Sequence, residues 1–436
     1  MSTRNVLSLF VVATIVLSSV CGLPALAAKK VTLRVMSPDS DFTEAWINLW
    51  NEQNPNIQVV REDLNPAKWI ADYMAGTPAD LMNIGAGAEI PFFVKRGMLL
   101  DLTDYFKKSS LIKEDDIDLE GCGAYRFDGE VSGQGSWYGL PKDYNNVTAI
   151  TYNKEIFTKA GIPFPSATEP MSYDEFYEIA QKLTDTSTKN VVFGTEVHGF
   201  WPFFIAGDMA AMIGKKLHSD DNLTLNDDPE IREIWKYFLK LRQEGISSNL
   251  ENPLSGWAGG AFQSGNIAMV QLGYWYGASC AAVEGYADKF GWAPAPVMEK
   301  GGKRVVNSLG ATGFVISART KHPDEAFKVF EWYMGGKPGL ERAETGWGIP
   351  PLKSMHALLP EETEFDKVRK ELALEEVKYM EPPQLSPYVR LDVYTASWNA
   401  AKQALLAGDV DMDGAIDMFY AAMNEAFALG KEEIGE

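Results

Sequence analysis

Strand and helix patterns alternate over residues 30–104, and this alternation restricts the fold more than any other feature of the sequence. Three apolar or β-branched runs predict strands, and each is followed by apolar residues at helical spacing. The predicted strands are 30–36, 57–61 and 79–84, and the predicted helices are 42–54, 69–74 and 89–96. Such an alternation predicts an α/β fold with parallel or mixed sheets flanked by helices.

The carboxyl ends of the first and third predicted strands supply the first candidate ligand residues. Ligands of such sheets gather where parallel strands end. These ends contribute Asp39, Asp41, Asn83, Gly85 and Gly87. The glycines would let a ligand approach the backbone. Helix capping explains the three polar residues equally well.

Residues 137–157 are predicted to pass from one compact unit to another. A turn at Gly139 and Pro141 leads into polar residues, and these give way to the β-branched run 147–151, which is predicted to be a strand. Taken alone, an ordinary loop, strand and turn is the simpler explanation. If the stretch is a crossing, residues 142–146 form the floor of a cleft. Tyr144 and Asn146 then become candidate site residues, with Asn146 at the site rather than in a turn.

Residues 1–28 have the three regions of a secretory signal peptide. Arg4 gives a short basic region, residues 6–20 are apolar but too short to span a membrane comfortably, and an Ala-Leu-Ala cleavage site follows at 25–27. We therefore expect export, to the periplasm or the cell surface. A lipid anchor at Cys21 is the alternative, although the residues before it match a lipobox poorly.

Length and charge limit the partners. A chain of 436 residues can form two domains with substantial cores. Its 60 acidic and 40 basic residues give a net charge of −20, which becomes −21 when the one charge of the signal peptide is removed. This surface would repel nucleic acid and anionic lipid, so we expect neither as a partner.

The sequence lacks the usual signatures of catalysis and metal binding. It has neither a G-x-S-x-G elbow nor a P-loop, and its four histidines are scattered. Residues 409–414 resemble the start of an EF-hand loop, but Tyr420 replaces the bidentate glutamate, so an acidic helix start is the better interpretation. Cys122 and Cys280 are expected to be buried free thiols in different lobes. We expect no metal and no cofactor, while a carboxylate pair for glycoside hydrolysis stays possible.

Aromatic residues stand where a buried strand is predicted to end. The predicted buried strand 266–272, apolar from Ile267 to Val270, is followed by Gly273-Tyr274-Trp275-Tyr276, and no folding requirement explains three successive aromatics there. A planar ring offers a face to the C–H surface of a sugar. Trp275 and Tyr276 are therefore candidate ligand residues, with packing at a lobe edge as the alternative. For Trp201 and Trp347, packing and ligand contact are equally good explanations.

Five ordered features resemble one protein family. They are Pro78-Ala79-Asp80-Leu81 with Gly97-Met98-Leu99-Leu100-Asp101-Leu102; Tyr138-Gly139-Leu140-Pro141 followed by Tyr152-Asn153-Lys154; Trp201-Pro202; Phe262-x-x-Gly265-x-x-Ala268-Met269 running to Gly273-x-Trp275; and Gly348-Ile349-Pro350. In this order they resemble the extracellular solute-binding proteins of bacterial ABC sugar importers, of the maltose-binding type. The likeness covers nearly all of the chain after the signal peptide.

The resemblance implies a two-lobed periplasmic-binding-protein fold of type II, with crossing strands as a hinge and sugar bound between the lobes. It places residues 29–143 and 304–346 in the first lobe, and 144–303 and 347–436 in the second. It also implies a monomer that presents its ligand to the transmembrane subunits of an ABC permease. The glycine-rich loop 85–87 differs from that of maltose binders, which argues against maltose.

The resemblance also assigns residues of the second lobe. Trp275 matches the stacking tryptophan of the family, and Glu196 and His198 precede Trp201 where the family places a carboxylate and an aromatic residue. Because His198 departs from that pattern, its assignment is weakened. Tyr394 falls near an aromatic residue of a late helix.

The function expected from the sequence is the binding of a neutral mono- or oligosaccharide for transport. Two alternatives stay open, namely a secreted glycosidase and a binding protein for a non-sugar ligand such as a polyamine. Asp39, Asp41 and Glu196 would be compatible with a polyamine.

Overall fold

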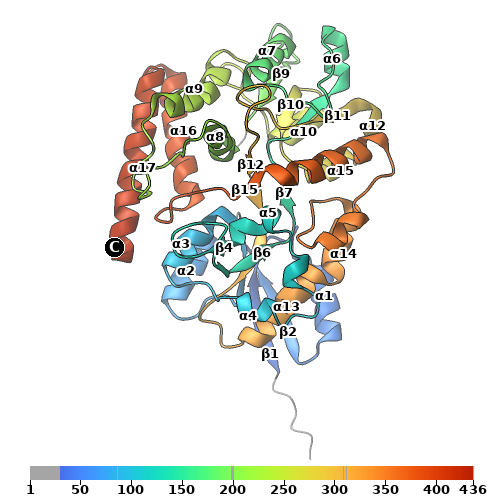
Figure 1. The fold of residues 1–436 in the computed structure, drawn as a ribbon, viewed down its shortest axis with the longest axis vertical. Coiled ribbons are helices and arrows are strands. Elements are labelled where there is room, and N and C mark those ends of the chain that lie inside the picture. Colours follow the sequence, from blue (N-terminus) through green and yellow to red (C-terminus); the bar gives the residue numbers. More distant parts are fainter. Residues whose placement is uncertain (1–29, 86, 198–200, 308, 311, 436) are drawn as a thin grey trace, which may run out of the picture.

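The computed structural model describes residues 30–85, 87–197, 201–307, 309–310 and 312–435. They form two lobes, one above the other in Figure 1, each built on its own sheet. This confirms the predicted two-lobed α/β fold with mixed sheets and flanking helices. The predicted signal peptide lies outside the described residues.

The first lobe contains a five-stranded sheet in the order β2-β1-β3-β14-β6. Its strands are β1 (Val31–Met36), β2 (Ile57–Glu62), β3 (Leu81–Ile84), β6 (Gly139–Pro141) and β14 (Gly313–Ile316). β1 is parallel to β2 and β3, whereas β14 is antiparallel to β3 and β6. A segment distant in sequence therefore lies beside the carboxyl end of β3, where a ligand residue was predicted.

Helices cover this sheet, and their starts follow local sequence rules. Asn65 caps α2 by accepting a hydrogen bond from the Lys68 amide, and Pro66 occupies the first turn, where a missing N–H costs nothing. The helices of this lobe are α1 (Glu44–Gln53), α2 (Pro66–Met74), α3 (Ile90–Lys95), α4 (Thr103–Phe106), α5 (Leu119–Cys122), α13 (Pro323–Gly335) and α14 (Lys337–Thr345).

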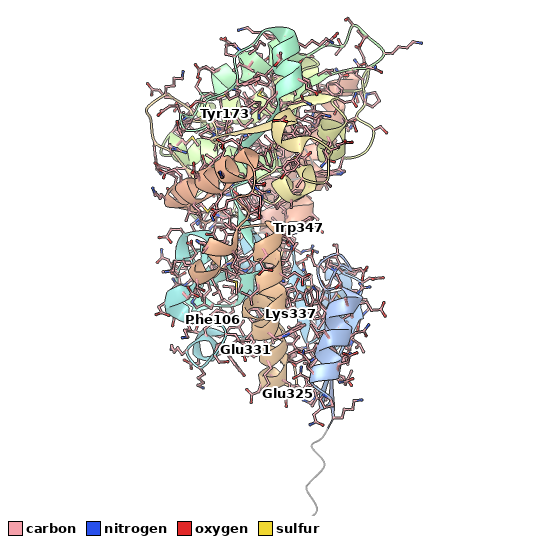
Figure 2. All side chains as sticks on the ribbon, turned by 90° about the vertical axis from the view of Figure 1, so that its right-hand side faces the viewer. Phe106, Tyr173, Glu325, Glu331, Lys337 and Trp347 are labelled. Atoms are coloured by element: carbon pink, nitrogen blue, oxygen red, sulfur yellow. The ribbon has the colours of Figure 1, made fainter. Side chains whose placement is uncertain are left out.

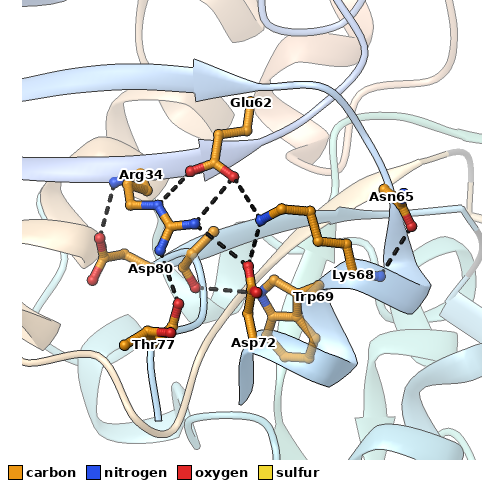
Figure 3. A network of polar contacts seen from close by, with 9 residues as sticks. Arg34, Glu62, Asn65, Lys68, Trp69, Asp72, Thr77 and Asp80 are labelled. Atoms are coloured by element: carbon orange, nitrogen blue, oxygen red, sulfur yellow. Dashed lines mark hydrogen bonds and ion pairs between the residues drawn. The ribbon is translucent and has the colours of Figure 1, made fainter. Parts of the chain in front are cut away.

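An ion-pair network links β1, β2 and α2 (Figure 3). The Arg34 guanidinium pairs with Glu62 and lies 3.5 Å from Asp72, while Lys68 lies 3.3 Å from Glu62 and 2.5 Å from Asp72. All four side chains are partly exposed, so the network contributes little to stability and mainly orients α2 on the sheet.

The second lobe contains a four-stranded sheet in the order β11-β8-β10-β9. Its strands are β8 (Ile150–Asn153), β9 (Phe193–Glu196), β10 (Ile267–Gln271) and β11 (Phe290–Ala293). β10 is parallel to β9 and antiparallel to β8. All five residues of β10 are buried, as expected from the apolar run that precedes the aromatic residues.

Helices α6 to α12 and α15 to α17 surround this second sheet. Ser172 and Glu175 form the predicted capping box of α7, and Asp411 caps α17, which explains the EF-hand-like acidic stretch. The helices are α6 (Lys154–Ala160), α7 (Tyr173–Leu183), α8 (Trp201–Met212), α9 (Pro229–Gln243), α10 (Ala258–Gln263), α11 (Tyr276–Cys280), α12 (Tyr286–Lys289), α15 (Glu364–Glu376), α16 (Leu391–Ala407) and α17 (Met412–Ile434).

Short strands join the lobes. β7 (Tyr144–Asn145) pairs antiparallel with β13 (Leu309–Gly310), and the amide of Tyr144 donates to the Ile349 carbonyl at 2.8 Å. Three segments from distant parts of the chain thus lie side by side at the crossing. In a second short pair, β12 (Val306–Asn307), which directly precedes β13 in sequence, lies parallel to β15 (Met380–Glu381).

The prediction of a strand at 147–151 is wrong for its first three residues. Residues 147–149 form a turn, and β8 begins only at Ile150. The reason is local: the Asn146 side-chain oxygen accepts hydrogen bonds from the Thr148 amide at 2.9 Å and hydroxyl at 2.6 Å. This side-chain turn competes successfully with the β-propensity of the run. The side-chain oxygen of Asn146 therefore organises a turn that the sequence did not predict, while a role for this residue in the site stays a prediction.

A second contact between the lobes lies at the two ends of α3. At its start, the Glu89 carboxylate lies 3.3 Å from the Arg390 guanidinium and accepts from the Leu391 amide at 3.3 Å. At its end, Arg96 donates to the carbonyl oxygens of residues 387–388, both at 3.2 Å. Glu89 thereby caps α16, which has no side-chain cap of its own.

The hydrophobic core of the first lobe also includes residues that follow α14 in sequence. Ile349, Leu352 and Met355 were predicted to lie in the second lobe, but they pack in the hydrophobic core of the first. The two described cysteines are free and buried, Cys122 in the core of the first lobe and Cys280 in that of the second, as predicted.

Candidate functional site

The first part of the candidate site is a set of polar contacts in the first lobe. The Asp41 carboxylate accepts a hydrogen bond from Asn83 at 3.0 Å and another from the Thr312 hydroxyl at 2.7 Å. Its other oxygen lies 3.5 Å from the Lys142 ammonium. Asp41 and Asn83 follow or end the strands named by the sequence analysis, and β14 leads Thr312 to the same place. The structure thus brings these two predicted residues into contact.

The contacts continue through the crossing to the second lobe. Lys142 lies 3.3 Å from Asp143, Asp143 accepts from the Asn145 side chain at 3.2 Å, and Asn145 accepts from the Trp275 amide at 2.8 Å. We call the series Asp41-Lys142-Asp143-Asn145 the polar chain. It connects the first lobe to the strand end that carries the predicted stacking tryptophan.

Charges along the polar chain are buried and mutually compensating. The Lys142 side chain is 4% exposed and that of Asp143 is 2% exposed. Burial alone would lower the pKa of Lys142, but the neighbouring Asp143 and Asp41 carboxylates outweigh it and raise that pKa. Burial raises the pKa of Asp143, against the opposing effect of Lys142. The lysine therefore stays protonated between two acids.

Three tryptophans form a row beside the polar chain. The rings of Trp257 and Trp347 each lie 5.9 Å from the ring of Trp275, which occupies the middle. Trp257 and Trp347 are each 40% exposed, so aromatic surface is left open to a ligand. The Lys142 ammonium lies 5.8 Å from the Trp347 ring, and Figure 2 shows Trp347 at the level where the two lobes meet.

Two buried side-chain atoms next to the polar chain lack a protein partner. The Asn83 oxygen and the Asn146 amide nitrogen find no hydrogen-bond partner among the described residues. Asn83 contacts Asp41, the first member of the polar chain, and Asn146 directly follows Asn145, its last member, in sequence. Because an unpaired buried polar atom is costly, each of them requires a partner, which an ordered water molecule or a bound group can supply. One is an acceptor and the other a donor, and a sugar hydroxyl can satisfy both.

Four predicted site residues have internal partners instead. The Tyr144 hydroxyl donates to Asp118 at 2.8 Å, the Tyr276 hydroxyl donates to a backbone carbonyl at 2.6 Å, and Tyr394 lies 2.7 Å from a ring nitrogen of His218. Glu196 pairs with an arginine and accepts from a backbone amide at 2.9 Å. All four are buried within one lobe, so their polar groups stabilise the fold.

The remaining predicted residues do not join the polar chain. The Asp39 side chain is 73% exposed and lies 3.4 Å from Arg61. Gly85 is exposed, with open space where a side chain would begin, whereas a Cβ at Gly87 would lie 2.8 Å from the Tyr125 ring. Gly87 therefore serves close packing. His198 lies outside the described residues, as does the side chain of Trp201 at the start of α8.

Asp143, Asn145, Thr312 and Trp257 were not predicted as site residues from the sequence. Asp143 and Asn145 lie in the predicted cleft floor, and a run of polar residues entering a β-branched segment was a signal for them. Thr312 is placed by the antiparallel pairing of β14 with β3 and β6, which local sequence patterns do not encode. Trp257 precedes two glycines in sequence, and only the fold brings it to Trp275.

The sequence of this chain matches a known protein family. The sequence model described as bacterial extracellular solute-binding protein matches residues 36–335. The chain belongs to this family. An uncharacterized ABC transporter extracellular-binding protein of Pyrococcus horikoshii is 24% identical over 304 residues. The alignment covers 66% of this chain, and the chain spans only 61% of the length of that relative.

Solved structures share the fold at low sequence identity. An ABC substrate-binding protein of Listeria monocytogenes in complex with cycloalternan superimposes with a TM-score of 0.73 at 19% identity, covering 93% of this chain and 100% of that one. A Thermotoga lettingae ABC transporter solute-binding protein bound with α-D-tagatose gives 0.70 at 20% identity, with coverage of 92% and 100%. One from Agrobacterium vitis with bound D-mannitol gives 0.68 at 22% identity, with coverage of 92% and 98%.

Within the described ranges, no cluster of three or more His, Cys, Asp or Glu side chains is placed to hold a metal ion. None of the helices in the described part of the chain combines the length and apolar character needed to cross a bilayer.

Proposed function

We propose that this protein is the substrate-binding component of an ABC importer. It binds a neutral mono- or oligosaccharide between its lobes and delivers it to the transmembrane subunits of a permease. Support comes from family membership and from the ABC transporters named for its relative and structural neighbours. Cycloalternan, tagatose and mannitol, which those neighbours contain, are all neutral and rich in hydroxyl groups.

The observation that carries the proposal is the pairing of unsatisfied polar atoms with open aromatic faces. The Asn83 oxygen and Asn146 nitrogen lack protein partners, and Trp275 and Trp347 lie beside the polar chain that runs between them. A sugar presents both kinds of surface, with hydroxyl groups at its edge and C–H groups on its face. The site thus fits a sugar better than a purely apolar or a purely ionic ligand.

The charges of the site favour a neutral ligand. Asp41 and Asp143 already share Lys142, and Asp41 accepts two further hydrogen bonds. Both carboxylates of the polar chain are therefore already paired. Glu196, outside the polar chain, is paired with Arg242, so none of these three carboxylates is free to form a polyamine cage. The same pairing removes Asp41 and Asp143 as a free acid and base, so glycosidase activity gains no support from this site.

Hinge closure is the mechanism that the crossing supports. A ligand can favour the closed state only through contacts that the open state lacks. Asn83 belongs to the first lobe, whereas Trp275 and the turn at Asn146 belong to the second, so a sugar that contacts all three links the lobes. Short paired strands such as β7 and β13 are where the backbone would absorb the rotation.

A thermal-shift screen of the mature protein tests this function. We expect a neutral sugar from a panel of mono-, di- and trisaccharides and polyols to raise the melting temperature, because ligand at 100 times Kd stabilises by about 2.7 kcal/mol. Spermidine and glucuronate serve as charged comparisons. The proposal fails if either charged compound shifts the transition and no neutral sugar does, or if sugar oligomers are cleaved during incubation.

The remaining expectations stay proposals. We propose export to the periplasm or the cell surface, a monomeric state, and no nucleic-acid partner. We also propose the expected division into lobes with one change, namely that the final crossing follows Leu359 rather than Gly346. The reason is that Ile349, Leu352 and Met355 share the core of the first lobe.

A further inference from the structure

Trp257 is an exposed tryptophan whose position suggests a role in ligand binding. It directly precedes α10, 40% of its surface is exposed, and its ring lies nearly parallel to that of Trp275, at an angle of 20°. Its other aromatic contact is with the edge of Tyr276, at 5.8 Å and 86°. An exposed residue of this size is rarely held so firmly, because exposed side chains usually keep their rotamer freedom.

The backbone beneath the ring explains how Trp257 is held. A Cβ at Gly259 would lie 2.0 Å from a ring carbon of Trp257, and one at Gly260 would lie 3.6 Å from its ring nitrogen. The indole therefore rests directly on the first turn of α10, which only glycine at position 259 permits. The ring is fixed in orientation while much of its surface stays open. Preorganised aromatic surface of this kind lowers the entropic cost of binding.

Trp257 extends the aromatic row away from the polar chain. Trp275 occupies the middle of the row, and its backbone amide donates a hydrogen bond to Asn145 of the polar chain, while the ring of Trp347 lies near Lys142. The ring contacts of Trp257 in the described part of the chain are with Trp275 and Tyr276, so it is connected to the polar chain through Trp275. A single sugar ring on Trp275 would already be within reach of the polar groups. The additional ring surface is more than one such sugar needs.

We infer that Trp257 forms an outer subsite, and that the ligand is a neutral oligosaccharide rather than a monosaccharide. This inference rests on the proposed function. The inner sugar stacks near Trp275 and bonds to the polar atoms, and the next sugar lies on Trp257. Hydrogen-bonding groups fix the inner sugar, whereas the outer contact is made mainly by an apolar face. The outer subsite therefore favours chain length over the identity of the second sugar.

Isothermal titration calorimetry on the mature protein tests the inference with three matched series. The probes are glucose, maltose and maltotriose; glucose, cellobiose and cellotriose; and mannose, mannobiose and mannotriose. In the series that binds, we expect the trisaccharide to bind at least about tenfold more tightly than the monosaccharide. Trp257→Ala should lower trisaccharide affinity by about fivefold or more and change monosaccharide affinity by less than about twofold.

Two further variants make the result specific. Trp257→Phe keeps a smaller aromatic face and should bind the trisaccharide with intermediate affinity. Met418→Ala changes a residue of α17 that is 42% exposed and should leave both affinities unaltered. If Trp257→Ala weakens mono- and trisaccharide equally, or weakens neither, the outer subsite is refuted while sugar binding stands. If no probe of the three series binds, the inference falls together with the sugar ligand itself.

Discussion

Replacing Trp275 by alanine should impair ligand binding and stability by separable amounts. The ring contacts Trp257 and Trp347, both at 5.9 Å, and Tyr276 at 5.7 Å, and an aromatic pair contributes about 0.5–1.5 kcal/mol beyond its buried area. Losing these three pairs should lower the free energy of unfolding by about 1.5–4.5 kcal/mol. Each kcal/mol of lost stability should lower the melting temperature by roughly 2–4 °C. The polar chain itself should persist, because it uses the backbone amide of residue 275, which alanine retains.

Ligand affinity should fall further than the loss of stability explains. In the proposed site the sugar loses its central stacking partner, which we expect to weaken binding at least about tenfold, or about 1.4 kcal/mol. The measurement pairs calorimetric titration of the sugar found by the thermal-shift screen with urea unfolding of the ligand-free protein. Trp275→Phe should recover part of both losses, because a smaller ring keeps the face.

Trp332 offers a matched control for this experiment. It is also partly buried and packs against two tryptophans, Trp46 at 6.1 Å and Trp50 at 5.1 Å, but it lies on α13 in the first lobe. Trp332→Ala should reduce stability by a similar amount and leave sugar affinity unaltered. Equal losses of affinity in the Trp275 and Trp332 variants would show that reduced stability alone explains the effect, and would refute a stacking role for Trp275.

Three further perturbations test the polar chain, the lobe contact at α3 and the acid response. Lys142→Met leaves two buried acids without their cation and should destabilise the protein by about 3–5 kcal/mol in urea unfolding; an unaltered midpoint would contradict the buried pairing. Glu89→Gln weakens the contact with Arg390 by about 1–2 kcal/mol and should enlarge the radius of gyration measured by small-angle X-ray scattering, with Glu425→Gln as the control at an exposed position of α17; equal radii would argue against a role in closure. Burial lowers the pKa of His218 from 6.5 to about 4. The unfolded chain therefore binds a proton in that window that the folded chain does not, and stability should fall by up to about 3 kcal/mol as pH drops from 6.5 to 4. His218→Gln should reduce this loss in urea titrations at the two pH values, and an identical pH dependence in both proteins would exclude His218 as its source.

Much of the architecture followed from local sequence. The alternation of strands and helices, the capping box at Ser172 and the acidic start of α17 are all decided by residues within a few positions of each other. The buried strand before Trp275 was predictable for the same reason. Local rules failed at residues 147–149, where the β-branched run predicted a strand. There one side chain, Asn146, diverts the backbone through two hydrogen bonds to Thr148.

The site was only partly accessible from the sequence. Asp41 and Asn83 could be proposed because the carboxyl ends of parallel strands meet at one edge of a sheet. Tyr144 and Tyr276 looked equally suitable, and the fold gives their hydroxyls internal partners instead. A polar or aromatic residue at a strand end can face either the cleft or the core, and the sequence does not contain the deciding contact.

The sequence by itself determined the class of fold, the order of its elements and a family resemblance, because these depend on local periodicity, capping and short motifs. Tertiary structure alone decided which distant residues meet. It brought Thr312 to Asp41 through β14, placed Lys142 between two carboxylates, and set Trp257 against Trp275 on a glycine backbone. Such contacts depend on the pairing of strands and the packing of helices far apart in the chain, so no local pattern specifies them.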